Sequence, residues 1–295
     1  MRSDARTASS VPPIPLADQI PPHAFFFVSA VFHYLGPSFA VLLFAQLAPV
    51  GVAWLRIASA GLVFAVWRRP WRFLLALPRR DQMIVVALGI VLAAMNTIFY
   101  EAIARLPLAT VGAIEFLGPI LVAAAGARTK RNLTALALAV GGVYVLTDMR
   151  LAGSMPGYMF AFGNCALFIL YILLGHRIAS ASGSASGIDR LGAAMLIASV
   201  AALPVGIHAA LPAFTDLALL GAAIGVGISS SVIPYVCDQL AMRRLPRHTF
   251  ALLLSLLPAT ATVIGFLILH QVPTLGELLG IALVIGGVAL HQAEA

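Results

Sequence analysis

The chain of 295 residues has few charged residues and almost no cysteine. Only 10% of its residues are charged and 61% are apolar, whereas soluble domains are nearer a quarter charged and half apolar. The apolar excess extends along the whole length, with a mean hydropathy of +1.00, so the sequence predicts an integral membrane protein. Cys165 and Cys237 both lie in apolar runs, and we expect them to pack as free thiols rather than form a disulfide.

The motifs of several enzyme classes are also missing. The sequence has no Walker, GxSxG or HExxH motif and no metal-ligand spacing. Its seven histidines are scattered, so no cluster indicates a membrane-embedded enzyme that acts on lipid. The net charge of +7 comes from short basic clusters between apolar runs, which signal membrane topology rather than nucleic-acid binding. We therefore expect no enzyme activity, no cofactor, no metal and no nucleic-acid partner.

Ten apolar runs follow a proline-rich start. Residues 1–24 are predicted to form a disordered cytoplasmic tail. A membrane-spanning helix needs about 20 mostly apolar residues. The runs that meet or approach this length cover residues 25–48, 50–67, 83–104, 108–127, 132–148, 156–177, 190–211, 216–242, 247–270 and 275–292. The sequence thus predicts an all-α protein with ten transmembrane helices.

The distribution of basic residues predicts the orientation of these helices. With the N-terminus inside, the outside loops hold only Arg105 and Arg150, and Arg56 lies within a run. Cytoplasmic loops are the ones enriched in Lys and Arg, so both termini are expected to be cytoplasmic. The fifteen basic residues on the inside are Arg2, Arg6, Arg68, Arg69, Arg72, Arg79, Arg80, Arg128, Lys130, Arg131, Arg177, Arg190, Arg243, Arg244 and Arg247.

Two pieces of sequence recur and divide the chain into halves. An Arg-Leu-Pro motif with a following Thr and Pro occurs twice, and so does an apolar-Gly-Gly-Val motif. The sequence therefore predicts two five-helix repeats, residues 25–148 and 156–292. Because five is odd, the second repeat is inverted relative to the first, a design typical of secondary transporters that work by alternating access. The matching residues are Arg105-Leu106-Pro107, Thr110 and Pro119 with Arg244-Leu245-Pro246, Thr249 and Pro258, and Gly141-Gly142-Val143 with Gly286-Gly287-Val288.

Glu115 is the acidic residue deepest in an apolar run. An ionised group at the bilayer centre costs about 2.5–3.5 kcal/mol on insertion scales, so Glu115 needs a reason to be there. It precedes Pro119 by four residues, and a proline frees the backbone carbonyl one turn earlier. Glu115 is thus a candidate for binding an ammonium group or a proton; the alternative is a protonated Glu bonded to a neighbouring helix. Pro119 and its repeat partner Pro258 are candidate hinges.

Two further titratable residues are candidate proton or charge sites. Asp238 follows Tyr235 by three residues and shares a helical face with it. Asp238 is also close to Arg243 at a helix end, so a solvated charge is an equal alternative to a substrate contact. His33 precedes a Gly-Pro-Ser segment in the first run and is either a proton site or a hydrogen-bonded structural histidine.

Neutral polar residues form two more faces. Asn96 and Tyr100 are one turn apart in the third run, and Asn164 and Tyr171 lie on one face of the sixth. Together with Tyr235, these side chains suit an uncharged or zwitterionic ligand, and interhelical hydrogen bonding is the alternative. We expect Arg56 to have a structural role, either reaching the membrane surface or pairing with a carboxylate.

The same regions carry a resemblance to a known family. The chain resembles the drug/metabolite transporter superfamily in its form with two EamA-type repeats, and within it the RhtA-like threonine/homoserine exporters. The residues that carry the resemblance are Arg69-Pro70-Trp71-Arg72, Met95-Asn96 with Phe99-Tyr100, Glu115-Phe116 with Gly118-Pro119, Ile233-Pro234-Tyr235, and Arg244-Leu245-Pro246 with Thr249-Phe250.

The chain departs from this pattern at three places. It has Leu257 where such exporters often carry an acid, His270-Gln271 where they tend to have Gly-Glu, and Val41 where a basic residue is usual. The resemblance implies a bacterial inner-membrane exporter of small amino acids, functional as a monomer and with protons as a candidate coupling ion. Other neutral or aromatic amino acids are within the range it implies. A transporter of another metabolite or drug, such as a nucleoside or nucleotide sugar, is the alternative, and a channel is a third.

Overall fold

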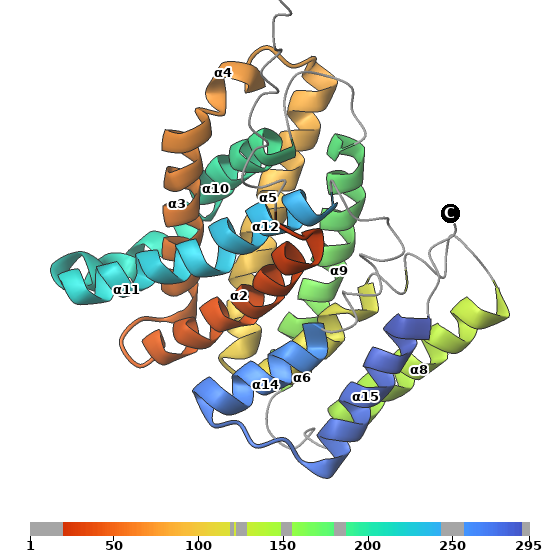
Figure 1. Cartoon of the computed structure of the whole chain (residues 1–295). Coiled ribbons are helices and arrows are strands. Elements are labelled where there is room, and N and C mark those ends of the chain that lie inside the picture. The colour runs from red at the N-terminus through yellow and green to blue at the C-terminus, as the bar shows by residue number, and fades with distance from the viewer. Residues whose placement is uncertain are drawn as a thin grey trace, which may run out of the picture.

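The computed structural model describes residues 20–118, 121, 129–148, 155–179, 187–242 and 257–290. Every regular element in these residues is a helix, which confirms the all-α prediction for them (Figure 1). The predicted tail lies outside the described residues up to position 19. Pro119 and the second Arg-Leu-Pro motif, residues 244–246, also lie outside them.

The first half of the chain is built of long helices joined by short connections. A four-residue helix, which the sequence did not predict, separates the second and third long helices. The described elements are α2 (Pro22–Leu43), α3 (Pro49–Arg68), α4 (Trp71–Leu74), α5 (Arg79–Ile103), α6 (Leu108–Glu115) and α8 (Lys130–Asp148).

The second half is also built mainly of long helices, and it departs from the predicted helices at one place. Its predicted run 216–242 is not a continuous α-helix, because a π-helical segment, η1, interrupts it. The described elements are α9 (Met155–Ala179), α10 (Gly187–Thr215), α11 (Leu217–Gly227), η1 (Ile228–Val232), α12 (Ile233–Met242), α14 (Leu257–Leu269) and α15 (Leu275–Leu290).

Prolines and capping side chains mark the helix starts. Pro22 and Pro49 occupy the first turns of α2 and α3, where a missing N–H leaves no hydrogen bond unmade. This is why α2 begins three residues before the apolar run. Asp216 caps α11 by accepting hydrogen bonds from two backbone N–H groups. Thr274 and Glu277 bond reciprocally at the start of α15, as in a capping box.

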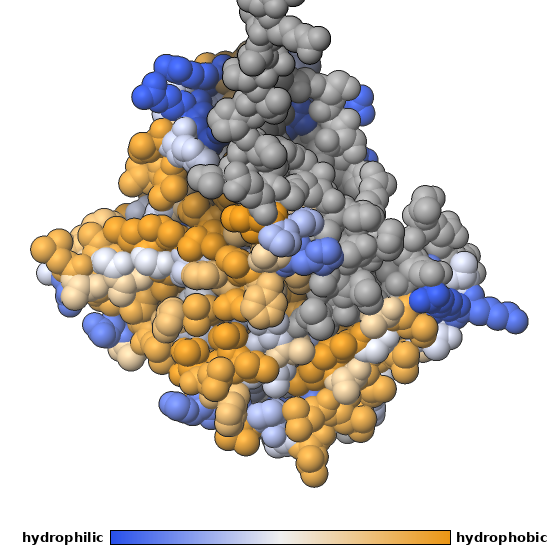
Figure 2. Space-filling view, in the orientation of Figure 1, coloured by the Kyte–Doolittle hydropathy of each residue, from blue (hydrophilic) through white to orange (hydrophobic). Residues whose placement is uncertain are grey.

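Several of these helices are long enough to cross a bilayer. Five segments of 20 to 29 residues qualify by length and hydropathy, and three shorter apolar helices accompany them. The shorter ones are Met155–Tyr171, Leu257–Leu269 and Leu275–Gly287. Apolar side chains cover much of the surface over α2, α11, α14 and α15, with hydrophilic residues near α4 (Figure 2). A surface of this kind suits contact with lipid.

Helices from the two halves pack against each other. The most extensive pairs are α3 with α10, α8 with α15 and α5 with α9, and each joins one half to the other (Figure 1). Small residues permit these approaches: a Cβ on Gly51 of α3 would lie 2.5 Å from the backbone of Ala209 in α10. Trp54 of α3 also donates a hydrogen bond to the Ser199 carbonyl of α10 over 3.0 Å. The halves therefore form one intermixed core.

Candidate functional site

Glu115 is the last residue of α6 and lies in the protein interior. The residue is 5% exposed, and its Oε1 accepts a hydrogen bond of 3.2 Å from Nδ2 of Asn164 in α9. Asn164 is fully buried. The structure thus brings together two residues that the sequence placed in different halves. The bond is compatible with either role considered for Glu115, because an amide N–H can donate to a carboxyl group in both protonation states.

Unused polar atoms surround this pair. Buried polar groups normally have partners, yet among the described residues Oε2 of Glu115, Oδ1 of Asn164 and the Tyr34 hydroxyl have none. The Tyr100 hydroxyl makes no hydrogen bond of good geometry with them either, but it lies beside Arg56 and Ser230. The Tyr34 hydroxyl lies against Gly112, one turn before Glu115, where an added Cβ would be 2.9 Å from it. The groups without a partner leave hydrogen-bonding capacity for a polar ligand in the interior.

Arg56 of α3 reaches the second half of the chain. Its Nε donates to the Ser231 hydroxyl over 2.8 Å and its Nη2 to the Ser230 carbonyl over 2.9 Å. Pro234 stands four residues after Ser230 and has no N–H to offer that carbonyl. Arg56 is 5% exposed, so it does not reach the surface. Among the described residues it pairs with no carboxylate, which corrects the two structural roles expected from the sequence.

The aromatic ring of Tyr100 completes the surroundings of Arg56. The guanidinium carbon lies 5.3 Å from the ring centroid, within the range of a cation–π contact. Tyr100 is fully buried. Its predicted neighbour on α5, Asn96, is buried as well, but its amide donates to the Leu92 carbonyl of the same helix over 2.7 Å. The face predicted for α5 therefore presents Tyr100 to the interior, while the Asn96 amide is bonded within its own helix.

The remaining predicted residues extend the polar region toward α12. Tyr235 is 7% exposed and interacts electrostatically with both Arg56 and Glu115. Tyr171 of α9 stacks on Phe168, with ring centroids 5.7 Å apart, and lies near Tyr235 and Asp238. Tyr171 and Tyr235 thus connect the central pair with Asp238.

Asp238 and His33 lie at the margins of this region. Asp238 lies beside Ser29 of α2, whose hydroxyl also donates to the Pro234 carbonyl over 3.2 Å. His33 is half-buried and contacts the edge of the Tyr34 ring, with centroids 5.3 Å apart. Among the described residues neither has a hydrogen bond to Glu115.

Of the two candidate hinges, Pro258 can be placed. It is buried at the start of the described part of α14, and its carbonyl accepts a hydrogen bond of 2.9 Å from Thr262. Pro119 lies outside the described residues, four positions after the end of α6. Among the described residues, no three His, Cys, Asp or Glu side chains gather to form a metal site.

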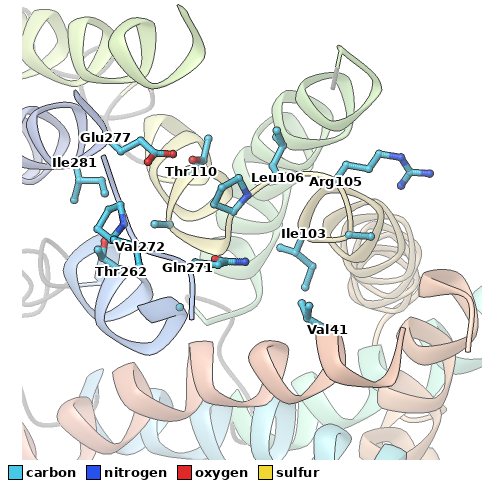
Figure 3. A pocket seen from close by; sticks show the side chains of 15 residues that line it. Val41, Ile103, Arg105, Leu106, Thr110, Thr262, Gln271, Val272, Glu277 and Ile281 are labelled. Atoms are coloured by element: carbon cyan, nitrogen blue, oxygen red, sulfur yellow. The ribbon is translucent and has the colours of Figure 1, made fainter. Parts of the chain in front are cut away.

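A separate pocket of about 430 Å³ opens between the two halves at the connections α5–α6 and α14–α15. Gln271 joins these connections by accepting a hydrogen bond of 3.2 Å from the Leu108 N–H. Thr110 and Glu277 point toward one another in this pocket, whereas Arg105 points away from them (Figure 3). Arg105 instead forms an ion pair with Glu101. In the predicted orientation both connections are on the outer side of the membrane.

Sequence reasoning missed the arginine contacts and this pocket. The sequence did contain a signal for the arginine contacts. Pro234 predicts an unpaired carbonyl at Ser230, and a buried Arg requires acceptors. The pocket had no comparable signal, because Gln271 lies just after one apolar run and Glu277 near the start of the next, where polar residues are ordinary. Helix partners across the two halves cannot be inferred from hydropathy.

Comparison with known proteins agrees with this architecture. Residues 155–291 match the EamA-like transporter family. The threonine/homoserine exporter RhtA of Salmonella typhimurium (strain SL1344) is 31% identical over 253 residues, 85% of this chain and 84% of that protein. RhtA of Escherichia coli (strain K12) is 32% identical over the same length.

A solved crystal structure shares the fold. It superposes with a TM-score of 0.60 at 18% identity, over 91% of this chain and 95% of the other. The sequence relatives cover most of both proteins, so the likeness is not confined to one repeat. The chain therefore belongs to the EamA-like transporter family.

Proposed function

We propose that this protein is a secondary transporter that exports small amino acids of the threonine and homoserine type across the bacterial inner membrane. The observation that carries the proposal is the buried pair Glu115–Asn164, whose second carboxyl oxygen has no partner. An α-ammonium group has three N–H donors and a positive charge, which suit such an oxygen. The similarity to threonine/homoserine exporters over 85% of the chain supports the same substrate class.

The proposed mechanism is alternating access between two inverted five-helix repeats. The site residues come from both halves: Tyr100 and Glu115 from the first, Asn164, Tyr171 and Tyr235 from the second. A relative movement of the halves about Pro119 and Pro258 would expose this region to one side at a time. The pocket beside Gln271 lies on the expected outer side and is the proposed exit route.

We also propose that the chain spans the membrane ten times, has both termini in the cytoplasm and acts as a monomer. The sequence has no nucleotide-binding motif, so the driving force is a gradient of substrate, with or without coupled protons. Glu115, Asp238 and His33 are the residues proposed to bind a coupled proton. Intramembrane basic residues would favour an anionic substrate, but Arg56 is the only Lys or Arg away from the ends of an apolar run, since Arg177, Arg190 and Arg247 stand at run ends. This argues against nucleotide sugars.

The test is exchange across a reconstituted membrane. Purified protein in proteoliposomes preloaded with unlabelled threonine should take up labelled threonine and homoserine, and a panel of other amino acids should show how broad the range is. A nucleoside and a nucleotide sugar serve as the competing substrates. Exchange of either of these, with none of any amino acid, would replace the proposal by the alternative transporter function.

A further inference from the structure

Two buried side chains of opposite charge lie in the interior without forming an ion pair. Arg56 and Glu115 are each 5% exposed. Within the described part of the chain, neither has an oppositely charged partner within 4.0 Å. Their charges nevertheless interact. Ionisable groups inside a membrane usually pair with one another or mark the path of a substrate, and these two do not pair.

Each of the two groups is only partly used. Arg56 commits Nε and Nη2 to Ser231 and Ser230, and its guanidinium group also lies beside the Tyr100 side chain. Glu115 commits Oε1 to Asn164, and its Oε2 is free. The arrangement therefore keeps one cationic donor and one carboxyl acceptor available, each held in place by bonds through its other atoms.

Tyrosines link the two groups. Tyr235 interacts electrostatically with both Arg56 and Glu115. The Tyr34 hydroxyl lies against Gly112, three residues before Glu115, and the guanidinium group lies over the Tyr100 ring. The Tyr34 hydroxyl has no partner among the described residues, and the Tyr100 hydroxyl lies beside Arg56 and Ser230. Neutral donors and acceptors therefore lie beside both charges, as a small polar ligand requires.

We propose that Arg56 binds the α-carboxylate of the substrate while Glu115 binds its α-ammonium group, so that the site selects a zwitterionic amino acid. The proposal rests on the proposed function and adds the residue that binds the carboxylate. Guanidinium groups match carboxylates geometrically and are less strongly hydrated than ammonium groups. A substrate that carries both charges compensates both buried side chains at once, which neither a cation nor an anion alone can do.

The contacts of Arg56 also join this site to the second half of the chain. Its two committed nitrogens hold Ser230 and Ser231 in η1, where Pro234 removes a backbone donor. η1 contacts α2 closely, because a Cβ on Gly36 would overlap Ser230. π-helical segments occur often at functional sites. A carboxylate bound to Arg56 would therefore act on a segment that both halves contact.

The experiment compares two ligands in the wild type and in Arg56→Gln. Threonine carries both charges, and 2-amino-1,3-butanediol has an alcohol in place of the carboxylate. Competition against labelled threonine in proteoliposomes should show that the wild type prefers threonine by about tenfold or more, the usual scale for a hydrogen bond between charged groups. In Arg56→Gln this preference should disappear, because threonine loses affinity and the amino alcohol does not.

Arg68→Gln is the matched control, because it removes the same charge from the cytoplasmic end of the same helix. It should keep the preference of the wild type. Arg56→Lys keeps the charge but lacks the planar guanidinium group, which can bond Ser230, Ser231 and a carboxylate at the same time. It too should therefore lose most of the preference for threonine. A purely structural role for Arg56 would weaken both ligands equally or lower the unfolding temperature without changing their ratio.

Each outcome is decisive. If the wild type exchanges threonine but the amino alcohol competes equally well, the protein does not recognise the carboxylate. The inference then fails, while the proposed function stands. An unchanged preference in folded Arg56→Gln, or in Arg56→Lys where the Gln variant does not fold, overturns the role of Arg56. If the wild type exchanges no amino acid, the proposed function fails and the inference fails with it.

Discussion

Gly142 of α8 and Gly287 of α15 hold corresponding places in the two halves, and each lies against the helix that carries the other. A Cβ on Gly142 would lie 2.5 Å from the Gly280 carbonyl oxygen, and one on Gly287 would lie 2.6 Å from that of Ala135. Both are the second glycine of the repeated Gly-Gly pair. The first glycines, Gly141 and Gly286, meet nothing within 4 Å. The repeated motif therefore has one structural use in both halves, which supports their descent from one unit.

Replacing these glycines by valine should show which member of the pair matters. Gly142→Val should lower stability by about 1–3 kcal/mol, the usual cost of overpacking a close contact, because the α8 and α15 backbones would have to separate. Gly141→Val, one position away, is the matched control and should stay within about 0.5 kcal/mol of the wild type. Thermal unfolding in detergent measures both. Equal effects of the two substitutions would contradict the packing.

An ion pair connects α3 and α10 at their predicted cytoplasmic ends. Arg68 Nη2 lies 2.6 Å from Asp189 Oδ1, with side-chain exposures of 33% and 14%. Because the pair is partly solvated, a double-mutant cycle with Arg68→Gln and Asp189→Asn should give a coupling of about 0.2–1 kcal/mol. High salt should reduce it. A coupling of zero in low salt would mean that the pair adds nothing to stability.

Asn164 should be needed to hold Glu115. Asn164→Leu removes the donor to Oε1 and leaves a buried polar group without a partner, which costs about 1–3 kcal/mol. The unfolding temperature should fall, and threonine exchange should fall with it. In a Glu115→Leu background the same substitution should cost much less, because the acceptor is already gone. Equal costs in both backgrounds would show that the hydrogen bond contributes no stability.

The orientation of the chain can be checked with reporter fusions. Fifteen basic residues on one side against two on the other predict cytoplasmic termini. A reporter fused after Ala295 should be active only if that reporter works in the cytoplasm. A second fusion in the α5–α6 connection at Arg105 should give the opposite result. A periplasmic signal at Ala295 would require an odd number of spans and would end the inverted-repeat model.

Much of the helical order could be predicted from hydropathy, because a bilayer requires long apolar helices whose backbone bonds are internal. The interruption at Ile228–Val232 was less accessible, since a π-helical turn differs from an α-helix by only one residue in its hydrogen bonds. Only Pro234, four residues after Ser230, indicated it. Helix boundaries at Pro22 and Pro49 followed proline chemistry rather than hydropathy.

The site was predictable by residue type but not by partner. A polar side chain deep in an apolar run requires a partner, which identified Glu115 and Asn164, and the structure joins them. Asn96 met the same criterion, but its amide bonds to the Leu92 carbonyl one turn earlier, a local alternative that asparagine often takes. Arg56 was expected to reach the membrane surface or to pair with a carboxylate, whereas its acceptors are Ser230 and Ser231 of the other half. Sequence periodicity gives the face of a helix, not its neighbour.

Glu115→Gln separates the roles open to this carboxyl group. Glutamine keeps the size and the acceptor for Asn164 but removes the charge and the titratable proton. If Glu115 binds the substrate ammonium, threonine affinity should fall by about tenfold or more, the usual scale for a charged hydrogen bond. If Glu115 carries only a coupled proton, affinity should survive while accumulation driven by a pH gradient is lost. We expect the loss of affinity. Threonine exchange measured over a range of pH, with and without an imposed gradient, distinguishes the two.

The control for Glu115→Gln is Glu101→Gln, which removes an acidic residue near the end of α5 that is paired with Arg105. It should leave threonine affinity unchanged. A third result is possible in principle: folded Glu115→Gln with unchanged rate, affinity and pH dependence. Glutamine would then satisfy every contact that matters, so Glu115 would be a neutral hydrogen-bonding partner of Asn164 and nothing more. In that case recognition of the ammonium group would have to come from neutral acceptors such as Oδ1 of Asn164 and the Tyr34 hydroxyl, which are buried and have no partner among the described residues.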